Sequence, residues 1–236
     1  MSRLSDSHHF RKTIAGVCMI GAPLLLLVGM VIHPERKSDV GDQLAVIAAN
    51  MDEWYVSHLL AAAALVLAVP AVLGLMHMLR EREVAFGHVG GGLALVGLLA
   101  SSGVVATQGF VGWQAGAAPG ADAGAMTALF ERVTDTAGVV LPIFVMSLGF
   151  AVGMLFLAAG LYRGRIVQSW TALSLATGAV VFALGTVIAS DVLAIVGSAV
   201  LLVGFFQVGR MVLRESDADW EHTPEYSGFR PLIGTR

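Results

Sequence analysis

Four of the seven histidines stand at the ends of long apolar segments, where an imidazole can bind a metal or a polar ligand. His33 and His58 mark one pair of segment ends, and His77 and His88 mark the other. Imidazoles paired at two levels are typical of proteins that hold two haems through bis-histidine ligation. The spacing argues against this interpretation, because a helix carrying His58 and His77 places them about 28 Å and about 100° apart. Haem therefore stays an alternative.

A zinc or copper ion bound by His33 and His58 is a second interpretation. Imidazole nitrogens and carboxylate oxygens both bind such ions, and the acidic residues that could complete the site are Asp39, Asp42, Asp52, Glu53 and Asp191. Their spacing matches no recognised metal-binding signature. A third interpretation places the histidines in the membrane interface, hydrogen-bonded to backbone or water. We predict no cofactor, with haem and a transition metal as the alternatives.

The surroundings of His58 favour a binding site. Trp54 and Tyr55 precede it, and four alanines (61–64) follow, which leaves room around the ring. The other polar or aromatic side chains at the same ends of their segments are Gln108, Trp113 and Asp191. If the helices close into a bundle, we expect an outward-facing polar pocket, and its predicted lining is His33, His58, Gln108, Trp113 and Asp191.

Catalytic motifs are absent from the sequence. It contains no His-Glu-x-x-His, no Gly-x-Ser-x-Gly and no Walker motif. Lys, Arg and Glu are missing from the middle of the apolar segments, and the single cysteine, Cys18, excludes an internal disulfide. The sequence therefore favours a protein that is not an enzyme.

The elements that must position these residues are membrane helices. Hydrophobic residues make up 56% of the 236 and charged residues 13%, about half of what soluble domains carry, and the mean hydropathy is +0.78. Apolar runs of about 18 or more residues indicate membrane spans. We predict an all-α, polytopic six-transmembrane-helix bundle with spans near 13–33, 57–79, 86–108, 137–161, 166–189 and 191–213. A segment (1–12) precedes the first span, and a polar, flexible tail (214–236) follows the last, in which Trp220 and Phe229 are candidates for docking.

The distribution of basic residues predicts the orientation. With the N-terminus inside, eleven Lys and Arg residues fall on the cytoplasmic side and three, Arg36, Lys37 and Arg132, on the other. Positive residues collect on the cytoplasmic side of membrane proteins. We therefore expect a multipass protein of the cell membrane with both termini in the cytoplasm. The net charge of −3 gives no indication of nucleic-acid binding, and the expected partners are the lipid bilayer and, as an alternative, further copies or a larger membrane complex.

A hairpin of two spans joined by an Arg-x-Arg turn occurs at 57–108 and again at 137–189, which suggests parallel internal repeats or a shared membrane composition. Apolar residues also recur at helical spacing in two outer connections, from Val40 to Trp54 after Ser38 or Asp39, and from Met126 to Val133 after Asp122. We expect two short amphipathic helices along the outer interface. Stripes of glycine and other small residues on the last four spans predict close helix packing more than a substrate groove.

Three segments carry a family resemblance: Ile14-Ala15-Gly16, Leu73-Gly74-Leu75 and the run from Gly90 to Leu95. Through them the chain resembles uncharacterised six-helix integral membrane proteins of high-GC Gram-positive bacteria over most of residues 11–213. The resemblance implies a fold and no activity.

Three functions stay open at this point. The first is a non-enzymatic binding, sensory or accessory protein with a ligand, lipid or partner at its outer face. The second is a small transporter or channel for a neutral solute, which needs polar residues through the bundle. The third is a haem- or metal-binding redox protein that uses His33 and His58.

Overall fold

The structure is a computed structural model that describes residues 7–117, 120 and 122–221, and these residues form helices joined by short turns. The prediction of an all-α six-helix membrane bundle is confirmed. The elements in chain order are α1 (Ser7–Ile32), α2 (Val40–Ala49), α3 (Met51–Met78), α4 (Val84–Val104), the π-helix Val105–Val111, α5 (Gly112–Ala117), α6 (Ala123–Asp135), α7 (Ala137–Arg163), α8 (Ser169–Val187), α9 (Asp191–Arg214) and α10 (Asp217–Glu221).

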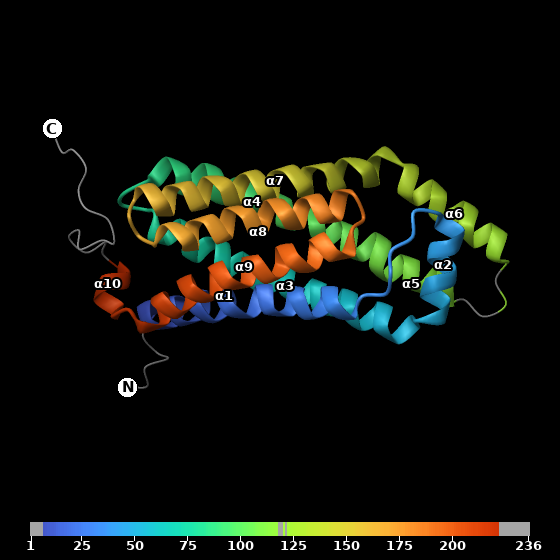
Figure 1. Ribbon diagram of the computed structural model, residues 1–236, viewed down its shortest axis with the longest axis horizontal. Helices are drawn as coiled ribbons and strands as arrows, with labels where there is room; N and C mark the ends of the chain where they lie inside the picture. The colour runs from blue at the N-terminus through green and yellow to red at the C-terminus, as the bar shows by residue number, and fades with distance from the viewer. Residues whose placement is uncertain (1–6, 118–119, 121, 222–236) are drawn as a thin grey trace.

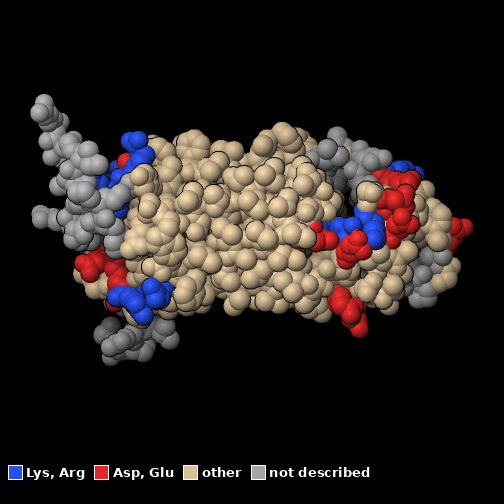
Figure 2. All heavy atoms as spheres, in the orientation of Figure 1, with Lys and Arg blue, Asp and Glu red and all other residues tan. Residues whose placement is uncertain are grey.

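Six of these helices are long and apolar enough to cross a membrane: α1, α3, α4 with its continuation to Gly116, α7 from Leu141, α8 and α9. Large apolar side chains on their outer surfaces are exposed, among them Val66, Leu99 and Val192 at 70% each. Figure 2 shows a broad belt without charged residues, with Lys, Arg, Asp and Glu gathered at the two ends. This pattern is that of a protein whose surface faces hydrocarbon, and the chain is a multipass membrane protein.

The six spanning helices form a closed ring in chain order. Each packs against the spanning helices before and after it, and α9 returns to pack against α1 (Figure 1). The closest pairs are α4 with α7, α8 with α9 and α1 with α3. The two predicted Arg-x-Arg hairpins, α3–α4 and α7–α8, are therefore not the most tightly packed units, because the small-residue faces lie toward the other neighbour.

Glycines bring the backbones of these pairs together. A Cβ on Gly153 of α7 would lie 2.4 Å from the amide nitrogen of Ala94 on α4, and one on Gly197 of α9 would lie 2.3 Å from that of Phe182 on α8. Only a residue without a side chain allows such an approach, which gives membrane helices their packing energy. The small-residue stripes therefore serve helix packing, as the sequence predicted.

The end of the bundle that carries α2, α5 and α6 is here called the cap end, and the end where α1 begins and α9 ends is the terminal end (Figure 1). Of the two predicted N-cap candidates of the first segment, Ser38 and Asp39, it is Asp39 that caps α2, because its carboxylate accepts a hydrogen bond from the amide of Asp42 (2.9 Å). Asp122 caps α6 in the same way, by accepting from the amide of Ala125 (3.0 Å). The apolar faces of α2 and α6 are covered by protein, and the position of the two helices along the membrane interface stays a prediction. These faces meet each other in a small second core formed by Leu44, Ile47, Trp54 and Phe130.

At three places the helices differ from the predicted segments. The first amphipathic segment ends at Asn50, whose amide and side chain bond the carbonyls of Ile47 (3.1 Å) and Val46 (2.8 Å). As a result Trp54 belongs to α3, which begins six residues before the predicted start. The helix of the third predicted span continues past Gln108, through the π-helix into α5. At the last boundary, residues 217–221 form α10 and pack onto the bundle.

Candidate functional site

Three aromatic rings meet at the cap end, between the end of α1 and the first turns of α3. The ring centroids of His33 and His58 lie 5.1 Å apart, and Trp54 lies 4.8 Å from His33 and 4.6 Å from His58. Trp54 and His58 share one face of α3 because they stand four residues apart. His33 reaches them because α1 and α3 pack side by side. We call His33, Trp54 and His58 the ring cluster.

Backbone carbonyls fix the orientation of both imidazoles. Nδ1 of His33 donates to the carbonyl of Pro34 (2.6 Å), and Nδ1 of His58 donates to the carbonyl of Trp54 (2.8 Å). In a neutral imidazole whose Nδ1 is the donor, Nε2 carries the lone pair. Each ring therefore presents Nε2 as a hydrogen-bond acceptor or a metal ligand.

The π-helix closes one side of the ring cluster. Nε1 of Trp54, which is only 5% exposed, donates to the carbonyl of Gly109 (2.9 Å). A Cβ on Gly109 would lie 2.2 Å from Cδ2 of His58, so this close approach requires glycine. π-helical turns are rare and often occur at functional sites. Sequence reasoning missed Gly109, and its nearest signal was the adjacent Gln108.

An ion pair lies next to the ring cluster. Nε of Arg36 donates to Oδ1 of Asp191 (2.6 Å), and the amide of Arg36 donates to Oδ2 of the same carboxylate (3.3 Å). This pair ties the loop after α1 to the start of α9. Burial and then the neighbouring His58 lower the pKa of His33 to about 4, while the bond to Pro34 acts in the opposite direction. His33 is therefore neutral at neutral pH.

The structure distributes the five predicted pocket residues over three groups. His33 and His58 are in contact, and Asp191 reaches their neighbourhood through Arg36. Trp113 packs instead on Tyr55, at 5.0 Å between ring centroids, and against the second core. Gln108 is half-buried in the π-helix, beside the glycine that contacts the ring cluster. Two residues that the sequence did not select complete this group: Trp54 contacts both imidazoles, and Arg36 pairs with Asp191.

The remaining candidate ligands do not gather around the two histidines. Asp39 caps α2, and Asp191 is paired with Arg36. Asp52 and Glu53 are exposed on the first turn of α3. Across residues 7–117, 120 and 122–221, no three His, Cys, Asp or Glu side chains form a group that could hold a metal ion. An ion at His33 and His58 would have these two imidazoles as its protein side-chain ligands.

The two histidines of the terminal end have separate surroundings. Nε2 of His77 bonds the carbonyl of Trp220 (2.8 Å), and the two rings stack with centroids 4.4 Å apart. His88 is exposed on α4, where Nδ1 donates to the carbonyl of Val84 (2.9 Å). This arrangement does not favour a second haem between His77 and His88, because the nitrogen of His77 that would bind iron is engaged.

Comparisons with known proteins give no match: no protein-family model, no curated protein and no solved structure is significantly similar to the chain. The resemblance to six-helix proteins of high-GC Gram-positive bacteria stays a prediction.

Proposed function

We propose that this multipass membrane protein is a non-enzymatic binding protein with a sensory or accessory role, and that its ligand site is the ring cluster at the cap end. The observation that carries the proposal is the pair of neighbouring imidazoles whose Nδ1 atoms are both anchored to backbone carbonyls. Anchoring in this way prepares both Nε2 atoms for one ligand, because neither ring can turn without breaking a hydrogen bond.

The energetics support a functional role. Two imidazoles side by side in a half-buried place lose hydration, and the lowered pKa of His33 records that loss. Apolar rings of the same size would pack against Trp54 without this loss of hydration. The close fit of Gly109 against His58 further restricts the position of that imidazole.

The chemistry of the site selects its ligand class. Neutral imidazoles with Nε2 lone pairs accept hydrogen bonds from N–H or O–H groups, and the flanking indole contributes an apolar, aromatic surface. A small polar molecule with hydrogen-bond donors fits these features. A carboxylate does not fit the acceptors, and the Arg36 guanidinium is already paired with Asp191.

A transition-metal ion is the second candidate, and the same anchoring favours it. Histidines that bind metals usually donate the other ring N–H to a carbonyl or carboxylate. Zinc and copper accept imidazole ligands readily. With two protein side chains available, the ion would complete its coordination with water or a small ligand.

The bundle interior gives less support to transport. The buried hydroxyls of Ser57, Ser147 and Ser198 bond carbonyls of their own helices. The core between them consists of apolar side chains, with Leu75, Leu157 and Leu175 fully buried. A polar path through the ring of helices is not among the features that the described residues present.

The proposal is tested by native mass spectrometry of the full chain, extracted in mild detergent, with a double variant His33→Phe/His58→Phe. Phenylalanine keeps the ring contacts and removes both nitrogens. His88→Phe is the matched control, because His88 makes the same type of Nδ1–carbonyl bond. We expect a bound mass in the wild type and in the control that the double variant lacks. Equal bound mass in all three proteins would contradict the proposal.

The metal candidate is tested on the same proteins with Zn²⁺ and Cu²⁺ as probes, together with elemental analysis and a visible spectrum. We expect one ion per chain and at least tenfold weaker binding in the double variant. A Soret band would instead indicate haem.

A further inference from the structure

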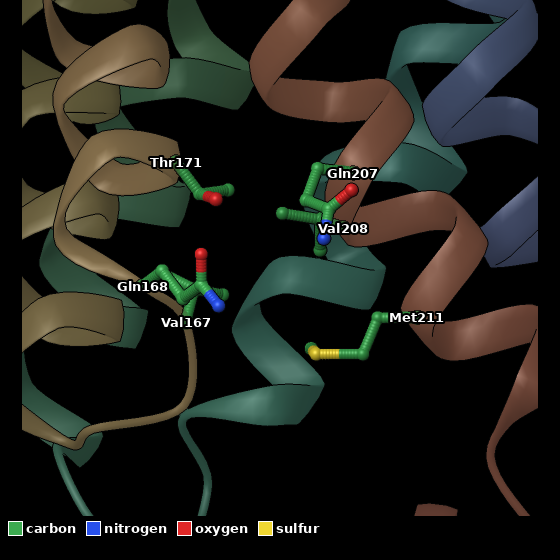
Figure 3. Close-up of a pocket in the computed structure, with 6 residues that line it drawn as sticks. All are labelled: Val167, Gln168, Thr171, Gln207, Val208 and Met211. Carbon is green, nitrogen blue, oxygen red and sulfur yellow. The ribbon is translucent and has the colours of Figure 1, made fainter. Parts of the chain in front are cut away.

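A small pocket opens at the terminal end, far from the ring cluster, between the first turn of α8 and the last turns of α9. Its lining consists of Val167, Gln168, Thr171, Gln207, Val208 and Met211. Figure 3 shows that Gln168 and Thr171 from one side and Gln207 and Met211 from the other point toward a common space. Neither the predicted pocket nor the proposed function uses these residues.

Thr171 is the central feature of this pocket. Its residue is 1% exposed, and its hydroxyl has no hydrogen-bond partner among the described residues. The hydroxyls of two other threonines of α8 have partners: Thr177 donates to the carbonyl of Leu173 (2.8 Å) and Thr186 to that of Phe182 (3.0 Å). A buried hydroxyl left without a partner is unfavourable. The free donor of Thr171 therefore marks a place where a ligand atom completes the structure.

The two carboxamides of the pocket also present donors. Oε1 of Gln168 accepts a hydrogen bond from Nε1 of Trp170, and Oε1 of Gln207 accepts one from Arg210 (3.0 Å). Each oxygen thus already accepts one hydrogen bond, and we assign the amide NH₂ groups as the donors that face a ligand. Together with the hydroxyl of Thr171, the pocket offers three donors and selects a ligand rich in acceptors.

The electrostatics of the pocket favour an anion. The helix α8 begins at Ser169, and its N-cap residue Gln168 makes no side-chain capping bond. The N-terminus of a helix carries a partial positive charge that stabilises phosphate and similar groups. No acidic side chain is part of the lining, and the Arg210 guanidinium is bonded to one lining residue.

The position of the pocket points to a lipid. It lies at the edge of the apolar belt, where the headgroups of a bilayer would be, and its remaining walls are the apolar side chains of Val167, Val208 and Met211. We propose that this pocket binds the phosphate of a phospholipid headgroup. The pocket has a volume of about 20 Å³, so one phosphate oxygen enters it and accepts hydrogen bonds from Thr171 and the two carboxamides, while the rest of the headgroup lies outside it along the membrane surface.

The experiment measures binding of phosphatidylglycerol to the full, delipidated chain by native mass spectrometry and by the rise in Tm on lipid addition. The variants are Thr171→Val, which removes the hydroxyl at constant shape, and Gln207→Leu. Thr177→Val is the matched control, since it makes the same change on an exposed turn of the same helix. Diacylglycerol and inorganic phosphate are the comparison ligands.

We expect phosphatidylglycerol to raise the Tm of the wild type and of Thr177→Val, with at least tenfold weaker apparent affinity in Thr171→Val and Gln207→Leu. Without lipid, Thr171→Val should be at least as stable as the wild type, because it removes an unpaired hydroxyl, so its loss of binding is not a folding defect. Equal lipid binding in Thr171→Val and wild type overturns the proposal. So does diacylglycerol that binds as well as phosphatidylglycerol. Inorganic phosphate that matches the lipid's affinity overturns the assignment to a lipid.

Discussion

At the scale of single residues, the four histidines at the ends of the apolar segments differ in the residues that surround them. His33 and His58 contact each other and Trp54, with Nδ1 of both rings anchored. His77 stacks on Trp220, and His88 is exposed. Only one imidazole pair therefore has its rings in contact and both Nδ1 atoms bonded to backbone, and the proposed ligand site rests on that pair.

The depressed pKa of His33 predicts a pH dependence of stability. Its pKa is about 4 in the folded protein and 6.5 as the ordinary value. As pH falls from 6.5 toward 4, the unfolded chain binds the proton first, so stability decreases over this window, by about 1–3 kcal/mol. His33→Gln removes this contribution. Thermal unfolding between pH 7.5 and 4 measures it, with His88→Gln as the control that keeps the wild-type profile. Parallel profiles for wild type and His33→Gln would refute the prediction.

The glycine that contacts His58 predicts a packing defect. Gly109→Ala places a methyl group 2.2 Å from Cδ2 of His58, and overpacking of this kind costs about 1–3 kcal/mol. Gly103→Ala is the matched control, because a Cβ there meets nothing within 4 Å. We expect a lower Tm for Gly109→Ala and an unchanged or higher Tm for Gly103→Ala. Equal Tm values would show that the π-helix adjusts without cost.

At the scale of elements, the two ends of the bundle are held by different interactions. The cap end is closed by an apolar core between α2, α3 and α6. The terminal end is joined by polar contacts between turns, in which Arg82 donates to the carbonyl of Gly164 (3.1 Å) and Arg163 to Glu83 (3.3 Å). The short helix α10 also docks there through Trp220, which is 4% exposed. The expectation of a flexible tail from residue 214 onward is therefore wrong for α10, and the rest of the predicted tail, with Phe229, lies outside the described residues.

A buried lysine holds α10 in place. Lys12 is 5% exposed, donates to the carbonyl of Glu215 (2.7 Å) and forms an ion pair with Asp217. Lys12→Met keeps the apolar stem and removes these bonds, which weakens docking by about 1–3 kcal/mol. We expect about 10- to 100-fold faster hydrogen–deuterium exchange in residues 215–221.

Arg214→Met is the control for this experiment, since it removes an exposed positive charge at the end of α9. Exchange should stay at the wild-type rate in that variant. Slow exchange in both variants would mean that the stacking of Trp220 on His77 is sufficient to dock α10.

At the scale of the whole molecule, the even number of spans brings the start of α1 and the end of α9 to the same end. The turns with Arg80, Arg82, Arg163 and Arg165 lie at that terminal end, and Arg36, Lys37 and Arg132 belong to the cap end. The grouping of basic residues follows the sequence prediction. The orientation toward the cytoplasm remains a prediction of the positive-inside rule.

Single cysteines test this orientation. Cys18 is the only cysteine and is buried, so Cys18→Ala provides the background. We expect a membrane-impermeant maleimide to label Ser38→Cys, at the cap end, in intact cells, and Glu81→Cys, at the terminal end, only after the membrane is opened. The reverse pattern would invert the topology.

The sequence by itself determined the membrane class and the six apolar helices, and it included Asp39 among the cap candidates of α2. These features depend on composition, on runs of apolar residues and on local hydrogen bonds, all of which are local in the chain. The break between the last two spans is an example, since Asp191 interrupts the apolar run and stands at the first position of α9. It also selected His33 and His58, because both stand at segment ends on the same predicted side and can bind a ligand or a metal.

Only the tertiary structure decided which of these residues meet. His33 and Trp54 come together because α1 packs on α3, and Gly109 reaches them because the third span continues as a π-helix past Gln108. The partners of Asp191 and Lys12 lie 155 and 205 residues away in the chain. Contacts over such separations depend on the order of helices around the ring. That order follows from the close approach of glycine faces such as Gly153 against Ala94, which no local pattern specifies.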